Sequence, residues 1–148
     1  MKYFIGNWKM FGVPKSINIL HKINYYYSKD KNRRKYRVII TPPYTLIESY
    51  AKYFKKKKII IGSQNCYQKD QFSSNTAAIS PYMIKKVGAK YTLVGHSDNR
   101  SEGDTNEMLK NKVHFALKNN LKVVFCIGEN KKEKKNKKTF SVLKKQLS

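Results

Sequence analysis

The sequence predicts an α/β fold built on a parallel sheet, and three observations carry this prediction. Strand-like and helix-like segments alternate from one end of the chain to the other, which is typical of parallel strands joined by crossover helices. The strands are short, apolar on both faces and rich in Val, Ile and aromatic residues, as expected for strands with both faces covered. Polar motifs follow directly after three strands, where reactive groups gather in parallel α/β proteins.

The first two strand-helix units are bounded by local signals. We expect a strand over residues 3–7 and a helix over residues 15–27. The second strand, residues 37–41, ends at Pro42-Pro43, because proline cannot donate to the hydrogen-bond ladder of a sheet. The second helix is expected over residues 44–54.

The third unit contains an unusually long connection. A strand over residues 59–64 is followed by a polar stretch over residues 66–78. Ser80 and Pro81 then predict a short helix, with serine as the cap and proline at the first helical position. A loop of this length without secondary structure usually has a function.

Two further units complete the chain. We expect a strand over residues 90–95, a helix over 105–119, a strand over 122–127 and a lysine-rich helix over 134–147. Five units without a linker predict a single domain, residues 1–148, which is long enough to bury a hydrophobic core. Periodicity alone allows either a barrel or an open, doubly wound sheet.

The chain is strongly basic, with 32 Lys and Arg residues against nine acidic ones and a formal net charge of +23. Such a charge favours contacts with nucleic-acid phosphates. However, only four of the basic residues are arginine, the side chain that base-edge and bidentate phosphate recognition favours. The lysines accompany many Asn, Ile and Tyr residues, all with A/T-rich codons, so drift in base composition accounts for the charge without a nucleic-acid partner.

Cysteine usage and hydropathy limit the class of protein further. Cys66 and Cys126 are far apart in the sequence and lie in or beside apolar strands, which favours two reduced, buried thiols over a disulfide or a metal site. The sequence contains no run of 18 apolar residues that would predict a membrane span. The first residues become polar too soon for the apolar segment of a signal peptide. We therefore expect a cytoplasmic protein without a membrane partner, a metal or another cofactor.

The three polar motifs that follow strands are Gly6-Asn7-Trp8-Lys9-Met10, Leu93-Val94-Gly95-His96-Ser97 and Phe125-Cys126-Ile127-Gly128-Glu129. Their order and separation resemble those of the triosephosphate isomerase family, whose members interconvert dihydroxyacetone phosphate and D-glyceraldehyde 3-phosphate in glycolysis and gluconeogenesis. The resemblance runs over all 148 residues and implies a TIM barrel. Because a full barrel takes about 250 residues, the chain is expected to hold the N-terminal part, five of eight βα units.

The resemblance implies roles for three residues. Asn7 and Lys9 match the residues that bind the phosphorylated triose substrate, and the Lys9 ammonium is expected near the oxygens that become negative in the enediolate. His96 matches the catalytic histidine, which in this enzyme family is the established example of a neutral imidazole that donates a hydrogen bond to the substrate carbonyl. His21 and His114 fall inside helical patterns and receive no role.

The resemblance also implies that a component of the active site lies elsewhere. The family's catalytic base is a glutamate after the sixth strand, whereas five strands are predicted here. Glu129 matches a different glutamate of the family and is not expected to abstract the proton. The chain alone is therefore expected to show little activity, and we expect it to associate with copies of itself or with a complementing chain that carries the missing units. The alternative is a degenerate barrel fragment that binds nucleic acid or other anions.

Two departures from the family pattern fall in the third and fourth connections. Ala77-Ala78 stand where the family has Gly-Glu, and Asn99 stands where it has the first of two arginines. In the family the lost glutamate and the lost arginine form an ion pair. Loss of both partners is far less costly than loss of one, so we expect a changed subunit interface.

Overall fold

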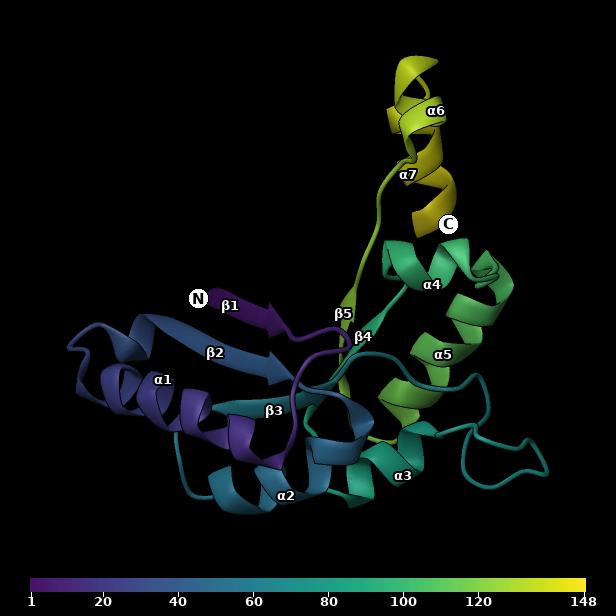
Figure 1. Cartoon of the computed structure of the whole chain (residues 1–148). Helices are drawn as coiled ribbons and strands as arrows, with labels where there is room; N and C mark the ends of the chain where they lie inside the picture. The colour runs from purple at the N-terminus through teal and green to yellow at the C-terminus, as the bar shows by residue number, and fades with distance from the viewer.

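Five parallel strands form one curved sheet in the computed structural model, which describes all of residues 1–148. Each strand pairs with its neighbour in the sequence, so the order across the sheet is β1-β2-β3-β4-β5. The strands are β1 (Lys2–Asn7), β2 (Tyr36–Thr41), β3 (Ile60–Ser63), β4 (Tyr91–Val94) and β5 (Lys122–Phe125). The sheet curls from β1 round to β5 (Figure 1), which confirms the predicted incomplete parallel barrel.

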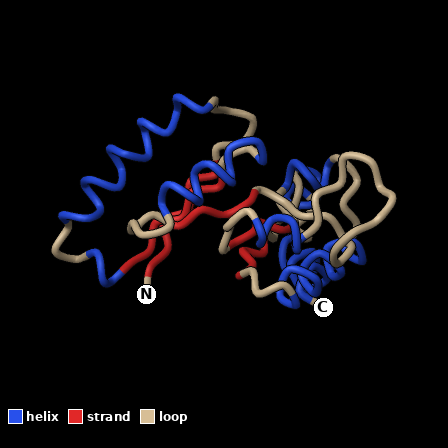
Figure 2. The backbone as a smooth tube through the Cα atoms, turned by 90° about the horizontal axis from the view of Figure 1, so that it is seen from below, coloured by secondary structure: helices blue, strands red, loops and turns tan.

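The helices lie mainly on the outer side of the curved sheet (Figure 2). They are α1 (Ile17–Lys29), α2 (Tyr44–Phe54), α3 (Pro81–Lys86), α4 (Ser97–Ser101), α5 (Asn106–Lys118), α6 (Lys131–Lys135) and α7 (Thr139–Leu147), with 3-10 turns at Pro14–Ser16 and Arg33–Lys35. None of them has both the length and the apolar character needed to cross a membrane.

Some of the predicted caps and ends in the first three units agree with the structure, and others differ by one or two residues. Helix α2 has the predicted limits, and the Ser80 side chain accepts a hydrogen bond from the Met83 amide at 3.2 Å, which caps α3 as expected. Helix α1 begins later than predicted, because residues Pro14–Ser16 form a 3-10 turn before it. The polar stretch over residues 66–78 contains no helix or strand, as predicted.

The single helix predicted over residues 134–147 is wrong, since two short helices occupy this segment. Asn130 and Glu133 form a reciprocal capping box, with hydrogen bonds of 2.9 and 2.8 Å, and this starts α6 earlier than expected. Lys137 then adopts the left-handed conformation at φ 54° and ends α6. The lysine-rich segment is therefore helical, as predicted, but in two pieces.

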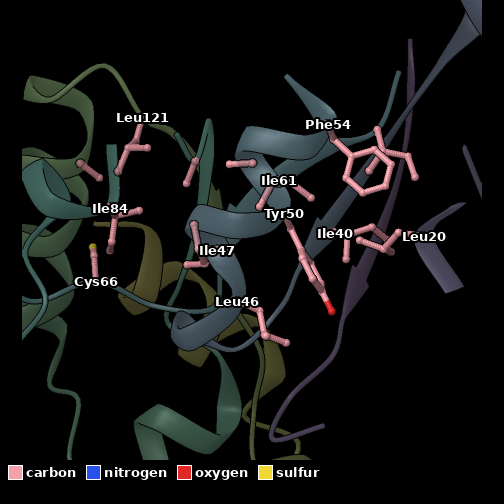
Figure 3. Close-up of a cluster of buried hydrophobic side chains, with 14 of the residues drawn as sticks. Leu20, Ile40, Leu46, Ile47, Tyr50, Phe54, Ile61, Cys66, Ile84 and Leu121 are labelled. Atoms are coloured by element: carbon pink, nitrogen blue, oxygen red, sulfur yellow. The ribbon is translucent and has the colours of Figure 1, made fainter. Parts of the chain in front are cut away.

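The hydrophobic core lies between the sheet and its outer layer of helices. Helix α2 contributes Leu46, Ile47, Tyr50 and Phe54, which pack toward the outward side chains of the strands (Figure 3). The remaining labelled core residues come from α1, β2, β3, α3 and the connections that follow β3 and α5: Leu20, Ile40, Ile61, Cys66, Ile84 and Leu121. This cluster fixes the strands, and through them the loops at their carboxyl ends.

Strand β1 differs from the inner strands because it has only one neighbour in the sheet. Its side chains Tyr3, Phe4 and Ile5 are all exposed, whereas every residue of β4 is buried. Successive residues of a strand point to opposite faces, so β1 is uncovered on both of its faces. The edge of the sheet therefore presents apolar side chains and unpaired backbone groups together.

The two cysteines are free thiols in different environments. Cys66 is buried, and Cys126 is only half-buried, which corrects the expectation that both are buried. Burial raises the pKa of the Cys66 thiol from its ordinary value of 9.0 to about 11.

This shift predicts a loss of stability at high pH. The native state keeps the Cys66 proton while the unfolded chain loses it, so the stabilisation is complete below about pH 9 and declines as the pH rises toward 11. By pH 10.5 the free energy of unfolding should fall by about 2 kcal/mol through this thiol. Urea unfolding at pH 8 and pH 10.5 measures the loss, and the Cys66→Ala variant should show a loss smaller by that amount. Equal losses in both proteins would contradict the prediction.

Candidate active site

The loops after β1 and β4 meet at one pocket of about 490 Å³ at the carboxyl ends of the strands. The three residues predicted for substrate binding and catalysis, Asn7, Lys9 and His96, all line this pocket. Two strands separate β1 from β4, but the curl of the sheet brings their loops together. The Lys9 Nζ atom lies 3.2 Å from Oδ2 of Asp98, just after His96.

The backbone of Lys9 is held in an unusual conformation. Its φ of 50° lies in the left-handed region, which costs a residue with a Cβ about 1–2 kcal/mol. The Asn7 side chain accepts a hydrogen bond from the Lys9 amide at 2.9 Å. On the other side, Gln64 Nε2 donates to the carbonyl of Lys9 at 2.8 Å and to that of Thr41 at 2.9 Å. These contacts fix the direction in which Lys9 leaves the strand.

The imidazole of His96 caps helix α4, and this contact defines its tautomer. Its Nδ1 atom accepts a hydrogen bond from the Asp98 amide at 3.2 Å. An acceptor nitrogen carries a lone pair, so the hydrogen of the neutral ring is assigned to Nε2. Nε2 is therefore the atom with which His96 can donate a hydrogen bond to a ligand in the pocket.

Asp98 links the two halves of the pocket electrostatically. Its hydrogen bond with the Lys9 ammonium is the main reason that the pKa of this carboxyl is lowered, and the nearby His96 and Ser97 contribute in the same direction. Asp98 thus remains ionised at neutral pH. It holds the long Lys9 side chain over the pocket, although both groups are about half exposed to solvent.

The family model described as triosephosphate isomerase matches residues 2–148, almost the whole chain. The chain belongs to the triosephosphate isomerase family. Its predicted relationship, drawn from three short motifs, is confirmed over the full length of the sequence.

Two comparisons show how close this relationship is. Over 145 residues the chain is 34% identical to triosephosphate isomerase of Leptospira interrogans, covering 96% of this chain and 56% of the relative. The enzyme of Wolbachia pipientis is also 34% identical over 143 residues, with coverages of 96% and 55%. The crystal structure of triosephosphate isomerase from Bartonella henselae superposes with a TM-score of 0.92 at 31% identity, covering 99% of this chain and 60% of that chain. The chain therefore spans little more than half the length of these relatives.

Sequence reasoning missed three residues that position the triosephosphate isomerase motifs. Gln64 clamps the Lys9 backbone, Asp98 holds the Lys9 ammonium, and Arg100 ties α4 to the neighbouring strand. Each acts across a distance of many residues, so no local pattern announces it. The position of Asp98 did carry a signal. The family motif has a glutamate there, so a carboxylate is present at this position in both cases.

Arg100 and Gly95 explain how the loop after β4 is built. The guanidinium of Arg100 donates to the carbonyl of Gly95 at 2.8 Å, to that of Cys126 at 3.2 Å and to Oδ1 of Asn106 at 3.0 Å. Gly95 has a φ of +80° and lies against the end of β5: a Cβ atom there would be 2.8 Å from the Cys126 carbonyl oxygen. Only glycine allows this close approach.

The Gly95→Ala variant should therefore lose about 2–4 kcal/mol of unfolding free energy, from left-handed strain and from displacement of the neighbouring backbone. Gly103→Ala is the matched control, because Gly103 also has a positive φ, +116°, but a Cβ atom there meets nothing within 4 Å. Urea unfolding of both variants separates steric overlap from backbone strain. Equal losses would show that the contact with Cys126 does not matter.

A buried ion pair anchors the loops around the pocket from below. Lys112 of α5 donates to both carboxylate oxygens of Asp104 at 2.7 Å and to Oδ1 of Asn65 at 3.1 Å. The side chains of Lys112 and Asp104 are only 5% and 9% exposed. Since Asn65 follows β3 and Asp104 precedes α5, Lys112 joins two loops that are far apart in the sequence.

Glu129 lines a neighbouring pocket of about 470 Å³, which His96, Arg100 and Gln146 also line. Its Oε1 atom accepts a hydrogen bond from the Thr139 hydroxyl at 3.3 Å. Glu129 is not among the residues that line the pocket of Lys9 and Asn7. That Glu129 is not the proton abstractor stays a prediction from the family resemblance.

Proposed function

We propose that this chain provides the substrate-binding side of a triosephosphate isomerase active site, which interconverts dihydroxyacetone phosphate and D-glyceraldehyde 3-phosphate. Asn7 and Lys9 bind the phosphorylated triose, and His96 is the catalytic residue that polarises its carbonyl. The observation that carries the proposal is the 3.2 Å contact between Lys9 and Asp98, because it joins the loops of two strands that are not neighbours. Because this reaction belongs to glycolysis, we also propose that the protein acts in the cytoplasm.

Catalysis by these residues is electrostatic. Isomerisation removes a proton next to a carbonyl, and the carbonyl oxygen becomes negative in the enediolate. The Lys9 ammonium and the Nε2 hydrogen of His96 stabilise this charge, and groups fixed in advance need no rearrangement at the moment of reaction. The capped Nδ1 of His96 and the clamped backbone of Lys9 supply this fixed arrangement.

Proton abstraction needs a further group. A carboxylate in this role contributes on the order of 10²–10⁴-fold to the rate, and in this family the base follows a sixth strand, whereas residues 1–148 contain five. The polypeptide of 148 residues, purified alone, should therefore turn over triose phosphate at a rate close to that of buffer. Turnover far above that of buffer would contradict this part of the proposal, provided that the mass of the assayed protein is that of the 148-residue polypeptide.

Binding tests the proposed site without requiring turnover. The probe is 2-phosphoglycolate, whose planar carboxylate next to a phosphate group imitates the enediolate. Nitrogen NMR of the imidazoles should show a hydrogen on Nε2 of His96, and the Nε2 signal should shift when the probe is added. Binding that leaves every His96 signal unchanged would overturn the assignment of this residue.

We also propose that the exposed apolar loops and edges of the chain meet a second polypeptide, either a copy of this chain or one that carries further βα units. Met10, Phe11 and Phe72 are 95%, 75% and 76% exposed and lie in connections after β1 and β3. The uncovered strand β1 adds open backbone groups to this surface. Sedimentation equilibrium at several concentrations and co-purification from the source cell test the proposal. A chain that is strictly monomeric and that co-purifies with no other polypeptide would count against it.

A further inference from the structure

A third pocket opens at the opposite end of the sheet from the proposed active site. It measures about 660 Å³ and lies where α2 and α3 end and where β3 and β4 begin. Fifteen residues line it, and six of them are lysines: Lys52, Lys55, Lys57, Lys85, Lys86 and Lys90. Glu48 is the one acidic residue in the lining.

The positive charge of this lysine pocket is not balanced within the protein. The four ion pairs of the structure involve other residues, and none of the six lysines lies within 4 Å of a carboxylate oxygen. Charges around a pocket of this size lie within or near the Debye length of about 8 Å at physiological ionic strength, so the ammonium groups repel one another. A bound polyanion would remove that repulsion.

Three of the lysines are held in place by neighbouring groups. Lys85 donates to the carbonyl of Asn120 at 2.7 Å, Lys57 lies 3.7 Å from the centre of the Tyr53 ring, and Lys86 lies 5.1 Å from the centre of the Tyr82 ring. Lys52, Lys55 and Lys90, by contrast, make no side-chain hydrogen bond or ion pair. The pocket thus combines ammonium groups with restricted positions and ammonium groups that remain free to contact a ligand.

The walls of the lysine pocket belong to the packed core. Phe54, Ile59 and Ile61 are each 3% exposed. Gly88, at φ +99°, lets the end of α3 approach α2 closely, because a Cβ atom there would lie 2.9 Å from that of Ala51. The shape is therefore set by secondary structure, and the volume falls within the range of about 300–1,000 Å³ typical of small-molecule sites.

We propose that the lysine pocket binds a compact oligophosphate, a linear chain of phosphate groups with three or four negative charges, either free or as part of a nucleoside triphosphate. Lysine presents a compact charge that suits phosphate oxygens from several directions. A single phosphate would contact only some of the six lysines that line the pocket. A nucleic-acid strand fits less well, because the six lysines gather around one pocket between two helix ends.

The test is equilibrium binding of inorganic triphosphate to the full chain, measured by titration calorimetry at low and at physiological salt. The test variant is K55Q/K86Q, which removes one lysine from the α2 side and one from the α3 side. The control is K131Q/K132Q, which removes the same charge from α6, outside the lysine pocket. All four side chains are exposed, so both variants should fold like the parent.

Inorganic triphosphate should bind with one site per chain. The pocket variant should weaken binding by about tenfold or more, since it removes two charge-assisted contacts with the phosphates, and the control should change binding by less than about twofold. Tighter binding of ATP than of triphosphate would support a nucleotide as the source of the phosphates, and equal binding would support a free oligophosphate. Three results would overturn the proposal. The first is that both variants weaken triphosphate binding equally, and the second is that triphosphate shows no saturable binding. The third is that a single-stranded oligonucleotide binds more tightly than triphosphate and that both variants weaken its binding alike.

Discussion

Replacement of Lys112 by methionine should lower the free energy of unfolding by about 3–5 kcal/mol, because it leaves a charged carboxylate buried without its partner. The Asp104 side chain is 9% exposed, and both of its oxygens accept from Lys112 at 2.7 Å. Methionine has nearly the length of lysine, so lost packing contributes little. Urea unfolding monitored by circular dichroism measures the change.

Two further variants isolate the cause. Lys118→Met removes an exposed partner on the same helix, where Lys118 lies 2.7 Å from Asp70, and should cost less than about 1 kcal/mol. The double variant Lys112→Met with Asp104→Asn removes both charges and should be more stable than Lys112→Met alone. If the double variant is the less stable of the two, the loss does not come from the unpaired charge.

Replacement of Lys9 by methionine should weaken binding of 2-phosphoglycolate at least tenfold. The ammonium is the positive group that the structure fixes over the pocket at the ends of the strands, and a hydrogen bond to a charged group contributes about 1.5–3 kcal/mol. Calorimetric titration of the parent and the variant at the same salt concentration gives the ratio of dissociation constants.

The matched control is Lys31→Met, since Lys31 is an exposed lysine in the turn after α1 and outside that pocket. Both variants lower the net charge by the same amount, so a general effect of charge weakens binding equally. An equal change in the two variants would therefore show that Lys9 contributes only to the overall positive field. Unfolding in urea should show that both variants remain folded.

The sequence predicted the elements whose signals are local. Helix α2 lies between the proline pair that stops β2 and the lysines that follow it, and its limits were predicted correctly. The Ser80 cap was likewise readable, because a serine before a proline defines the start of a helix wherever the chain is placed. The same holds for the positions of Asn7, Lys9 and His96 at strand ends, which family motifs marked.

The contacts that complete the site were not predictable in this way. Asp98 meets Lys9, and Gln64 meets the Lys9 carbonyl, only because the sheet curls, and the hydrophobic period of a strand does not encode curvature. Helix α4 has five residues, too few to display a helical period. The break at Lys137 depends on a left-handed backbone, which lysine rarely adopts, so its sequence position gave no sign of it.

The departure at residues 77 and 78 has a structural cost that the sequence did not reveal. Ala77 has a φ of 63°, in the left-handed region, at a position where the family pattern has glycine. The chain therefore places alanine in a backbone conformation to which glycine is best suited. The conformation of this loop is thus determined by its surroundings rather than by Ala77 itself.

Strand β1 carries Tyr3, Phe4 and Ile5 into solvent on a molecule whose formal charge is +23. In dilute buffer, electrostatic repulsion between these highly charged molecules keeps their exposed β1 strands apart. In 1 M salt that repulsion reaches only about 3 Å, while attraction between apolar surfaces persists. Aggregation of the protein should therefore depend on ionic strength: solutions should stay clear at low salt and become turbid as salt is added.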